Sequence, residues 1–208
     1  MALVTSSRLS VLAFLTLAMA ACQDTAPLPR YVSNADDGKK PVLAPATAAI
    51  AIDTKTTASK GYGYFIEFRS RYALSYGHTY VVFGRANRSG EMINPQVAGL
   101  HPRSESQVPY MLGHFVPVAA ETGVSDGDLE EKYRSASWRV MLSESEYNKV
   151  VADIRKLQKS SPVWHAALYN CNAFVASIAK TMGYKTPAIQ LRSQQFVTKL
   201  REMNAGKA

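Results

Sequence analysis

The chain has 208 residues, a formal net charge of +8, 47% hydrophobic residues and 19% charged residues. This length accommodates one domain of about 100–200 residues with additional segments, and the composition excludes a membrane-embedded bundle and a disordered polymer. The basic residues are spread along the chain, which predicts a solvated basic surface. Attraction to acidic lipid headgroups or to an anionic cell-wall polymer is the alternative, and no motif indicates nucleic-acid binding.

The N-terminal residues, 1–22, have the parts of a bacterial export signal. Arg8 precedes the apolar stretch Leu9–Ala20, which is too short to span about 30 Å of hydrocarbon. The small residues before Cys22 resemble a lipobox, with Met19 where leucine is usual, so we expect Cys22 to be lipidated. Ordinary signal-peptidase cleavage after Ala20 is the alternative. Both interpretations predict an exported protein.

Residues 23–60 predict a tether between the membrane and the domain. They are rich in Ala, Pro, Thr, Asp and Lys and lack a sustained period. The piece Ala48–Ile52 is a candidate short edge strand. We expect residues 61–208 to form the folded domain of a membrane-anchored lipoprotein that faces the periplasm in the bacterial cell envelope.

Alternating patterns predict an antiparallel sheet at the start of this domain. Aromatic or aliphatic residues alternate with polar ones from Tyr64, and residues 81–83 form a β-branched and aromatic run typical of a buried strand. The turn sequence ANRSG at 86–90 then favours a returning strand over residues 91–97. Pro95 indicates that this strand lies at an edge of the sheet.

Two further strands are expected over residues 108–118 and 137–143, and three helices follow. Ser143 and Glu146 have the capping-box spacing at the start of the first helix. The second helix begins near Asn170 and ends at Gly183, a residue type common after helix ends. The third covers residues 193–204. The fold class is therefore α+β, a small antiparallel sheet packed against two or three helices.

Cys171 is left without a partner if Cys22 is cleaved off or acylated. It shares one helix face with apolar residues such as Phe174 and Ile178, and one interpretation is an inert, buried thiol. The other follows from its place beside Asn170, a good N-cap residue, which puts Cys171 in the first turn of the helix. There the helix dipole is expected to lower the thiol pKa from about 8.5 and to favour a nucleophilic thiolate.

A thiol nucleophile needs a base, and the chain has four histidines: His78, His101, His114 and His165. His78 opens the apolar strand in YGHTYVVFG, where an imidazole has the exposure of a proton acceptor. A structural or surface role is the alternative for each histidine taken alone.

The strand His78-Thr-Tyr-Val-Val-Phe-Gly and the later Asn170-Cys171-Asn172-Ala173-Phe174 resemble the circularly permuted papain-like thiol hydrolases. These include NlpC-type, lecithin:retinol acyltransferase-like and PPPDE-like proteins. The resemblance implies a permuted papain-like fold in which Cys171 is the nucleophile, His78 its general base and Asn170 the helix cap. It also implies a third polar residue on the following strand, for which Asn94 is the first choice, with Gln96 and His101 next. No cofactor or metal is required.

The resulting expectation is an exported, membrane-anchored cysteine hydrolase or acyltransferase. It would act on an amide or ester through an acyl-thioester, with a peptidoglycan stem peptide or a lipid acyl chain as the substrate. The alternative is an envelope lipoprotein that uses the same fold for binding or structure, with Cys171 inert.

Overall fold

The computed structural model describes residues 63–73, 76–104 and 106–206. The expected export signal, Cys22, the tether and the candidate strand at 48–52 lie outside these residues. The described part belongs to one compact unit and is α+β, as the sequence predicted. Among the described residues, no helix is long and apolar enough to cross a membrane.

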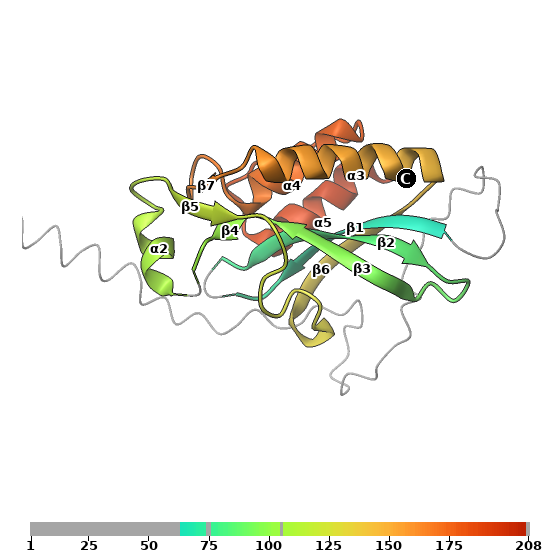
Figure 1. Cartoon of the computed structure of the whole chain (residues 1–208), viewed down its shortest axis with the longest axis horizontal. Helices are drawn as coiled ribbons and strands as arrows, with labels where there is room; N and C mark the ends of the chain where they lie inside the picture. The colour runs from blue at the N-terminus through green and yellow to red at the C-terminus, as the bar shows by residue number, and fades with distance from the viewer. Residues whose placement is uncertain (1–62, 74–75, 105, 207–208) are drawn as a thin grey trace, which may run out of the picture. The chain divides into compact units, whose positions relative to one another are not determined.

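Two antiparallel sheets form the β-structure (Figure 1). The main sheet has the order β3-β2-β1-β6 and is built from β1 (Gly63–Arg71), β2 (His78–Ala86), β3 (Met92–Gly99) and β6 (Arg134–Leu142). The smaller sheet has the order β4-β5-β7 and contains β4 (His101–Pro102), β5 (Val118–Glu121) and β7 (Val163–Trp164). Strand β3, which carries Pro95, lies at an edge of the main sheet, as predicted.

The helices follow the sequence signals closely after residue 143. They are α3 (Glu144–Lys159), α4 (Cys171–Thr181) and α5 (Ser193–Asn204). Ser143 and Glu146 form the predicted capping box of α3. Gly183 has φ +81 just after α4, a left-handed conformation that glycine adopts without strain.

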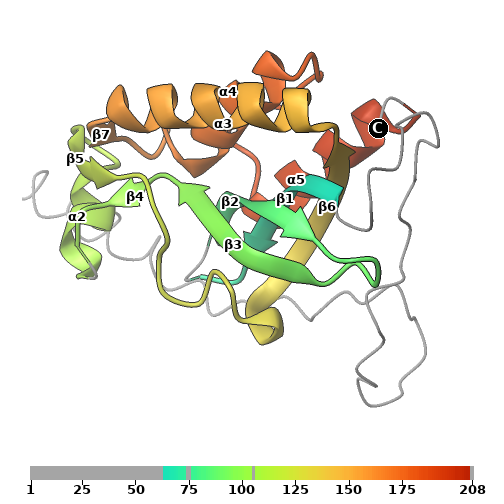
Figure 2. The same ribbon diagram turned by 45° about the vertical axis from the view of Figure 1, so that its right-hand side comes forward.

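The predicted strand over residues 108–118 is wrong. The chain instead forms α2 (Gln107–Leu112), and β5 begins only at Val118. Ser106 caps the helix by accepting a hydrogen bond from the backbone N–H of Val108, and α2 has no buried residue. A run that is apolar at most positions does not distinguish a strand from a helix. Helix α2 and the small sheet gather at one end of the main sheet (Figure 2), and a 3₁₀ turn at Glu131–Tyr133 precedes β6.

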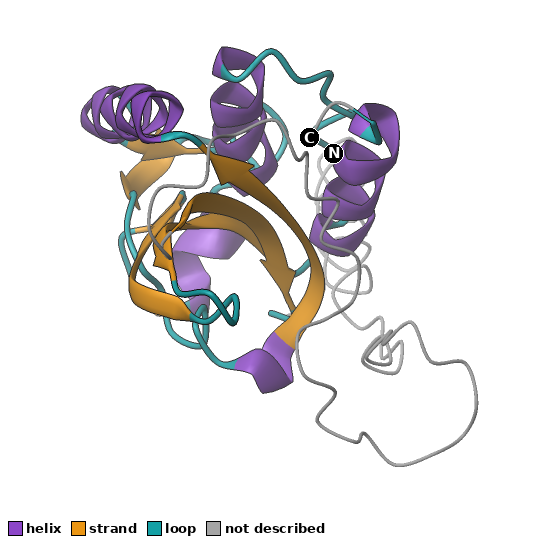
Figure 3. Cartoon of the chain, turned by 90° about the vertical axis from the view of Figure 1, so that its right-hand side faces the viewer, coloured by secondary structure: helices purple, strands orange, loops and turns teal. Residues whose placement is uncertain are grey.

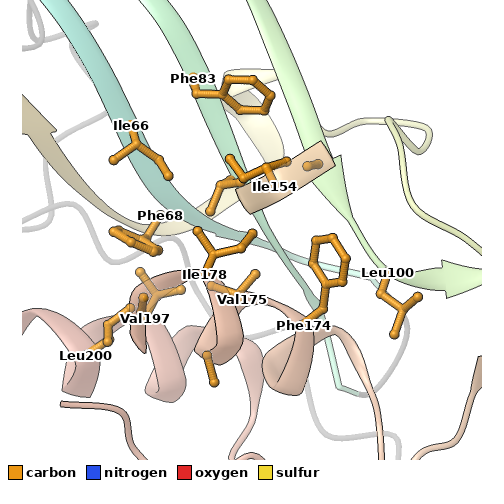
Figure 4. Packing of buried hydrophobic residues seen from close by; sticks show 14 of the residues in the cluster. Ile66, Phe68, Phe83, Leu100, Ile154, Phe174, Val175, Ile178, Val197 and Leu200 are labelled. Carbon is orange, nitrogen blue, oxygen red and sulfur yellow. The ribbon is translucent and has the colours of Figure 1, made fainter. Parts of the chain in front are cut away.

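The three long helices cover one face of the curved main sheet (Figure 3). Ile66 and Phe68 of β1 meet Phe174 and Ile178 of α4 in the apolar core, and each of these four side chains is at most 1% exposed (Figure 4). Burying each such side chain contributes about 1.5–3 kcal/mol. This apolar core fixes α4, and therefore Cys171, against the sheet.

The opposite face of the main sheet combines apolar and charged side chains. Phe65, Tyr80 and Val82 form a second, smaller cluster there. Beside it, Glu67 accepts hydrogen bonds from Arg69 Nε at 2.8 Å and Arg139 Nε at 2.6 Å, although Glu67 and Arg69 are only 2% and 1% exposed. Burial raises the pKa of the Glu67 carboxyl, but the two guanidinium groups outweigh it and hold the pKa below its ordinary value.

Candidate active site

Cys171 is the first residue of α4, and Asn170 is the N-cap residue that the sequence predicted. The Asn170 side chain accepts a hydrogen bond from the backbone N–H of Ala173 at 3.0 Å. Its amide group donates to the carbonyl oxygens of Ala166 at 2.7 Å and Ile189 at 3.1 Å. The segments on both sides of α4 are therefore fastened to the residue that precedes the thiol. Cys171 itself is partly exposed.

Hydrogen-bond donors surround the sulfur of Cys171. The Ser193 hydroxyl and the backbone N–H groups of Thr79 and Asn172 act on it as donors, the N–H dipole of Cys171 itself adds to them, and together they lower the thiol pKa. Burial is the larger effect and raises the pKa above its ordinary value. The expected net lowering by the helix N-terminus is therefore wrong, although the N–H groups there do act in the expected direction.

A short polar network joins the start of α4 to β2. The Thr79 hydroxyl donates to Asn172 Oδ1 at 2.6 Å. The Asn172 amide group in turn donates to the carbonyl oxygens of Ile189 at 3.0 Å and Leu191 at 2.7 Å. Because Thr79 also donates its backbone N–H to the sulfur, the thiol contacts the residue that directly follows His78.

The imidazole of His78 is buried on the other side of β2 from the Thr79 side chain. It stacks on Tyr80, with ring centroids 5.6 Å apart and an interplanar angle of 13°. His78 is 7% exposed, and its Nε2 atom has no hydrogen-bond partner among the described residues. Burial lowers the pKa of His78 to about 4; the Asp128 carboxylate opposes this shift, and Arg71 and His101 add to it. The imidazole is therefore neutral at neutral pH.

His101 is the residue that the fold brings to His78. Tyr80 of β2 pairs with Gly99 of β3, and two residues further along each strand the rings of His78 and His101 lie edge to face, with centroids 6.0 Å apart. His101 Nδ1 lies 3.1 Å from the carbonyl oxygen of Pro102. Because a carbonyl only accepts, Nδ1 carries a proton, whereas Nε2 is on the other side of the ring. That Nε2 is also buried and unpaired among the described residues.

Asn94, the first choice for the third polar residue, is wrong on this geometry. It is exposed, has φ +45 and lies in a register shift opposite Gly84. Six residues separate Gly84 from His78 along β2, about 20 Å at the usual rise of a strand. Gln96 pairs with Phe83 and accepts a hydrogen bond from Arg155, so it is also remote from the imidazole.

Gly99 leaves the space in which the His78 ring lies. A Cβ atom at this position would be 2.8 Å from His78 Nε2 and 3.0 Å from Tyr80 Cβ. The first distance is too short for any larger residue unless the imidazole moves, and the second is tight even then. The absence of a side chain at Gly99 therefore sets the position of His78.

The acidic group near His78 is Asp128, which the sequence analysis did not identify. Asp128 is 1% exposed and accepts a hydrogen bond from Arg71 Nε at 2.6 Å, and Arg71 pairs with His78 across β1 and β2. The Ser125 backbone N–H donates to the same carboxylate at 2.7 Å, and the Tyr80 hydroxyl donates to the Asp128 carbonyl oxygen at 2.5 Å. The Ser125-to-Asp128 spacing of a side-chain-capped turn was the available signal.

The remaining histidines are engaged elsewhere. The His114 ring contacts Tyr76 at 5.9 Å, and His165 Nδ1 accepts the backbone N–H of Ala167 at 3.2 Å. Within the described ranges, no group of three or more His, Cys, Asp or Glu side chains is arranged to hold a metal ion. No family model, curated protein or solved structure matches the chain, so the papain-like resemblance stays a prediction.

Proposed function

We propose that the protein is a cysteine hydrolase or acyltransferase that acts on an amide or ester, with Cys171 as the nucleophile and His78 as the general base. The supporting observation is the place of Cys171 as the first residue of α4, capped by Asn170 and joined to β2 through the Thr79–Asn172 hydrogen bond. The N–H groups of Thr79 and Asn172 and the Ser193 hydroxyl act as donors to the sulfur there. Donors held in this way stabilise negative charge on a sulfur or on the oxyanion formed by a neighbouring carbonyl.

The pKa shifts favour a neutral thiol and a neutral imidazole over a preformed ion pair. For the reaction, the imidazole of His78 must turn from the far side of β2, where it stacks on Tyr80, toward the sulfur. Cys171 then loses its proton to His78 as the sulfur–carbon bond forms and the carbonyl electron pair moves to oxygen. When the tetrahedral intermediate collapses, the imidazolium protonates the leaving amine or alcohol. Water or another acceptor cleaves the thioester, giving its proton to His78, and the thiol is restored. His101 is a positioning residue for the imidazole.

The expected export signal supports a location in the bacterial cell envelope. Lipidation of Cys22 would anchor the chain to the membrane, and the domain would face the periplasm. A peptidoglycan stem peptide or a lipid acyl chain is the substrate class available at that site.

One observation favours a second candidate function, an envelope lipoprotein with no catalysis. The His78 ring stacks on Tyr80, on the other side of β2 from the Thr79 side chain that faces α4. Burial also raises the thiol pKa and lowers the imidazole pKa, which disfavours an ion pair between the two groups. In that case Cys171 contributes to packing and His78 to the buried face of the sheet.

Alkylation by iodoacetamide separates the two candidates. In a Cys22→Ser background Cys171 is the only thiol, so the rate of labelling reports on it alone. We expect labelling of the folded protein, at least a tenfold lower rate in His78→Gln, and an unchanged rate in the control His114→Gln, whose ring is exposed. An activated acyl ester should leave an acyl group on Cys171. Labelling that requires denaturation, or equal rates in both variants, would rule out the enzyme.

A further inference from the structure

The segment around α2 exposes an unusual amount of apolar surface. Phe115 is 79% exposed, and its neighbours Met111, Leu112 and Val116 are 50–53% exposed. Since α2 has no buried residue, these side chains do not support the core. We name Met111, Leu112, Phe115 and Val116 the α2 patch.

Two other segments extend the α2 patch. Tyr76 is 64% exposed, and its ring contacts His114, the neighbour of Phe115. The carbonyl oxygen of Gly113 accepts the backbone N–H of Ala166 at 2.9 Å, which joins the patch to the turn that carries Leu168, 72% exposed. Large contiguous apolar surfaces on soluble proteins mark protein or membrane contacts.

The α2 patch adjoins the candidate active site. The carbonyl oxygen of Tyr76 accepts the backbone N–H of Ser193 at 3.1 Å, and the Ser193 hydroxyl donates to the Cys171 sulfur. A surface that lies against the patch therefore also lies near the thiol.

The rest of the chain indicates what this surface is. If Cys22 is lipidated, the forty residues 23–62 connect the lipid to β1, and they reach at most about 140 Å even when fully extended. The net charge of +8 suits an anionic bilayer. Two exposed arginines lie in segments next to the patch: Arg192 precedes Ser193, and Arg103, four residues before α2, makes an exposed ion pair with Glu121 at 3.6 Å.

We propose that the α2 patch docks on the anionic lipid bilayer to which Cys22 anchors the chain. Its aromatic and aliphatic side chains enter the interface between headgroups and acyl chains, and the arginines meet the phosphates. The proposal rests on the predicted export and lipidation. It holds whether or not Cys171 is catalytic, because no step of it uses the thiol.

An environment-sensitive fluorophore at the patch tests the proposal directly. The full chain with Cys22→Ser and Cys171→Ala has no cysteine, so Phe115→Cys can be labelled with a nitrobenzoxadiazole dye. The matched control is Met203→Cys, at an exposed apolar position on α5. The probe is vesicles of phosphatidylethanolamine and phosphatidylglycerol at about 3:1.

We expect the emission of the dye at position 115 to rise at least twofold and shift to the blue on adding vesicles, with quenching by spin-labelled lipid. The dye at position 203 should not respond. Adding Leu112→Ser and Val116→Ser should weaken the vesicle affinity reported at position 115 at least tenfold. Because these side chains are exposed, the melting temperature should not change.

Three results would overturn the proposal. One is no response at position 115, and the second is the same response at positions 115 and 203, which indicates binding through another part of the chain. The third is a vesicle-independent response that rises with protein concentration, together with a dimer that Leu112→Ser and Val116→Ser convert to monomers. That result would make the patch an interface between two copies of the chain. Iodoacetamide labelling of Cys171 is a separate measurement, so the two proposals can fail independently.

Discussion

The two faces of the main sheet bury different kinds of side chain. On the helix side, apolar residues such as Phe68 and Phe174 form a continuous core with no charged member. On the other side, Glu67 and Arg69 are as deeply buried as the apolar residues beside them. The first face is stabilised by apolar area and, at the start of α4, by the uncharged hydrogen bond of Thr79 to Asn172, whereas the second depends on pairing of its charges.

The candidate site has residues on both faces of the sheet, because the neighbouring β2 residues His78 and Thr79 point to opposite sides. Thr79 faces α4 and donates to Asn172, while the ring of His78 stacks on Tyr80 on the other side. The sulfur of Cys171 has several donors, whereas His78 Nε2 has no partner among the described residues. The donors around Cys171 therefore favour negative charge on its sulfur, and burial keeps the imidazole of His78 neutral.

Breaking the charge cluster should have the largest effect on stability. Glu67→Gln removes the carboxylate that pairs with Arg69 and Arg139, and it leaves the buried Arg69 guanidinium paired with Glu131 alone. We expect a loss of about 3–5 kcal/mol in the free energy of unfolding, measured by urea denaturation at pH 7.

The matched control is Glu130→Gln, which removes a carboxylate from an ion pair with Lys132 on the surface. The exposed pair should contribute less than about 1 kcal/mol. Equal losses in the two variants would show that the second face does not depend on its charges in the way described.

The next effect is a pH dependence assigned to His78. Its pKa is lowered from 6.5 to about 4 in the folded protein, so between these values the unfolded chain binds a proton that the folded protein does not. Stability is therefore full above pH 6.5 and falls as the pH drops to 4, by about 3 kcal/mol in total for this group. Because the pKa of Glu67 is lowered in the folded protein, this carboxylate reduces the free energy of unfolding only as the pH falls below 4.5.

His78→Gln should remove most of the slope between pH 6.5 and 4.5, and His114→Gln should leave it intact. Urea unfolding at half-unit pH steps measures both. A slope that persists unchanged in His78→Gln would mean that groups other than His78 cause the pH dependence.

The sequence predicts correctly the features that depend only on neighbouring residues in the chain. The capping box of Ser143 and Glu146, the cap at Asn170 and the glycine after α4 lie within a few residues of the helix ends they determine. The α+β class follows from the same patterns, since strand and helix periods are properties of short windows.

The sequence was insufficient where the outcome depends on distant parts of the chain. The turn at 86–90 alone sets position 94 opposite Gly84, far from His78, so the choice of Asn94 misreads the hairpin. The one-residue register shift that sets His101 rather than Leu100 opposite His78 is visible only in the paired strands. The thiol pKa follows from burial by several segments, against which the start of α4 is a smaller effect. Alternation in β1 did not reveal that Glu67 and Arg69 are covered.

The smallest expected effect concerns the influence of Ser193 on the pKa of the Cys171 thiol. The Ser193 hydroxyl donates to the Cys171 sulfur and lowers its pKa, so Ser193→Ala should raise that pKa further and reduce the thiolate fraction. We expect iodoacetamide labelling at pH 8 to slow by about three- to tenfold, because one pKa unit corresponds to a tenfold change in that fraction. Ser177→Ala, which removes a hydroxyl that donates to the Ala173 carbonyl oxygen in the same helix, should label at the wild-type rate. If both variants label at that rate, the backbone N–H groups alone determine the electrostatics of the sulfur, and the hydroxyl only fills space at the start of α5.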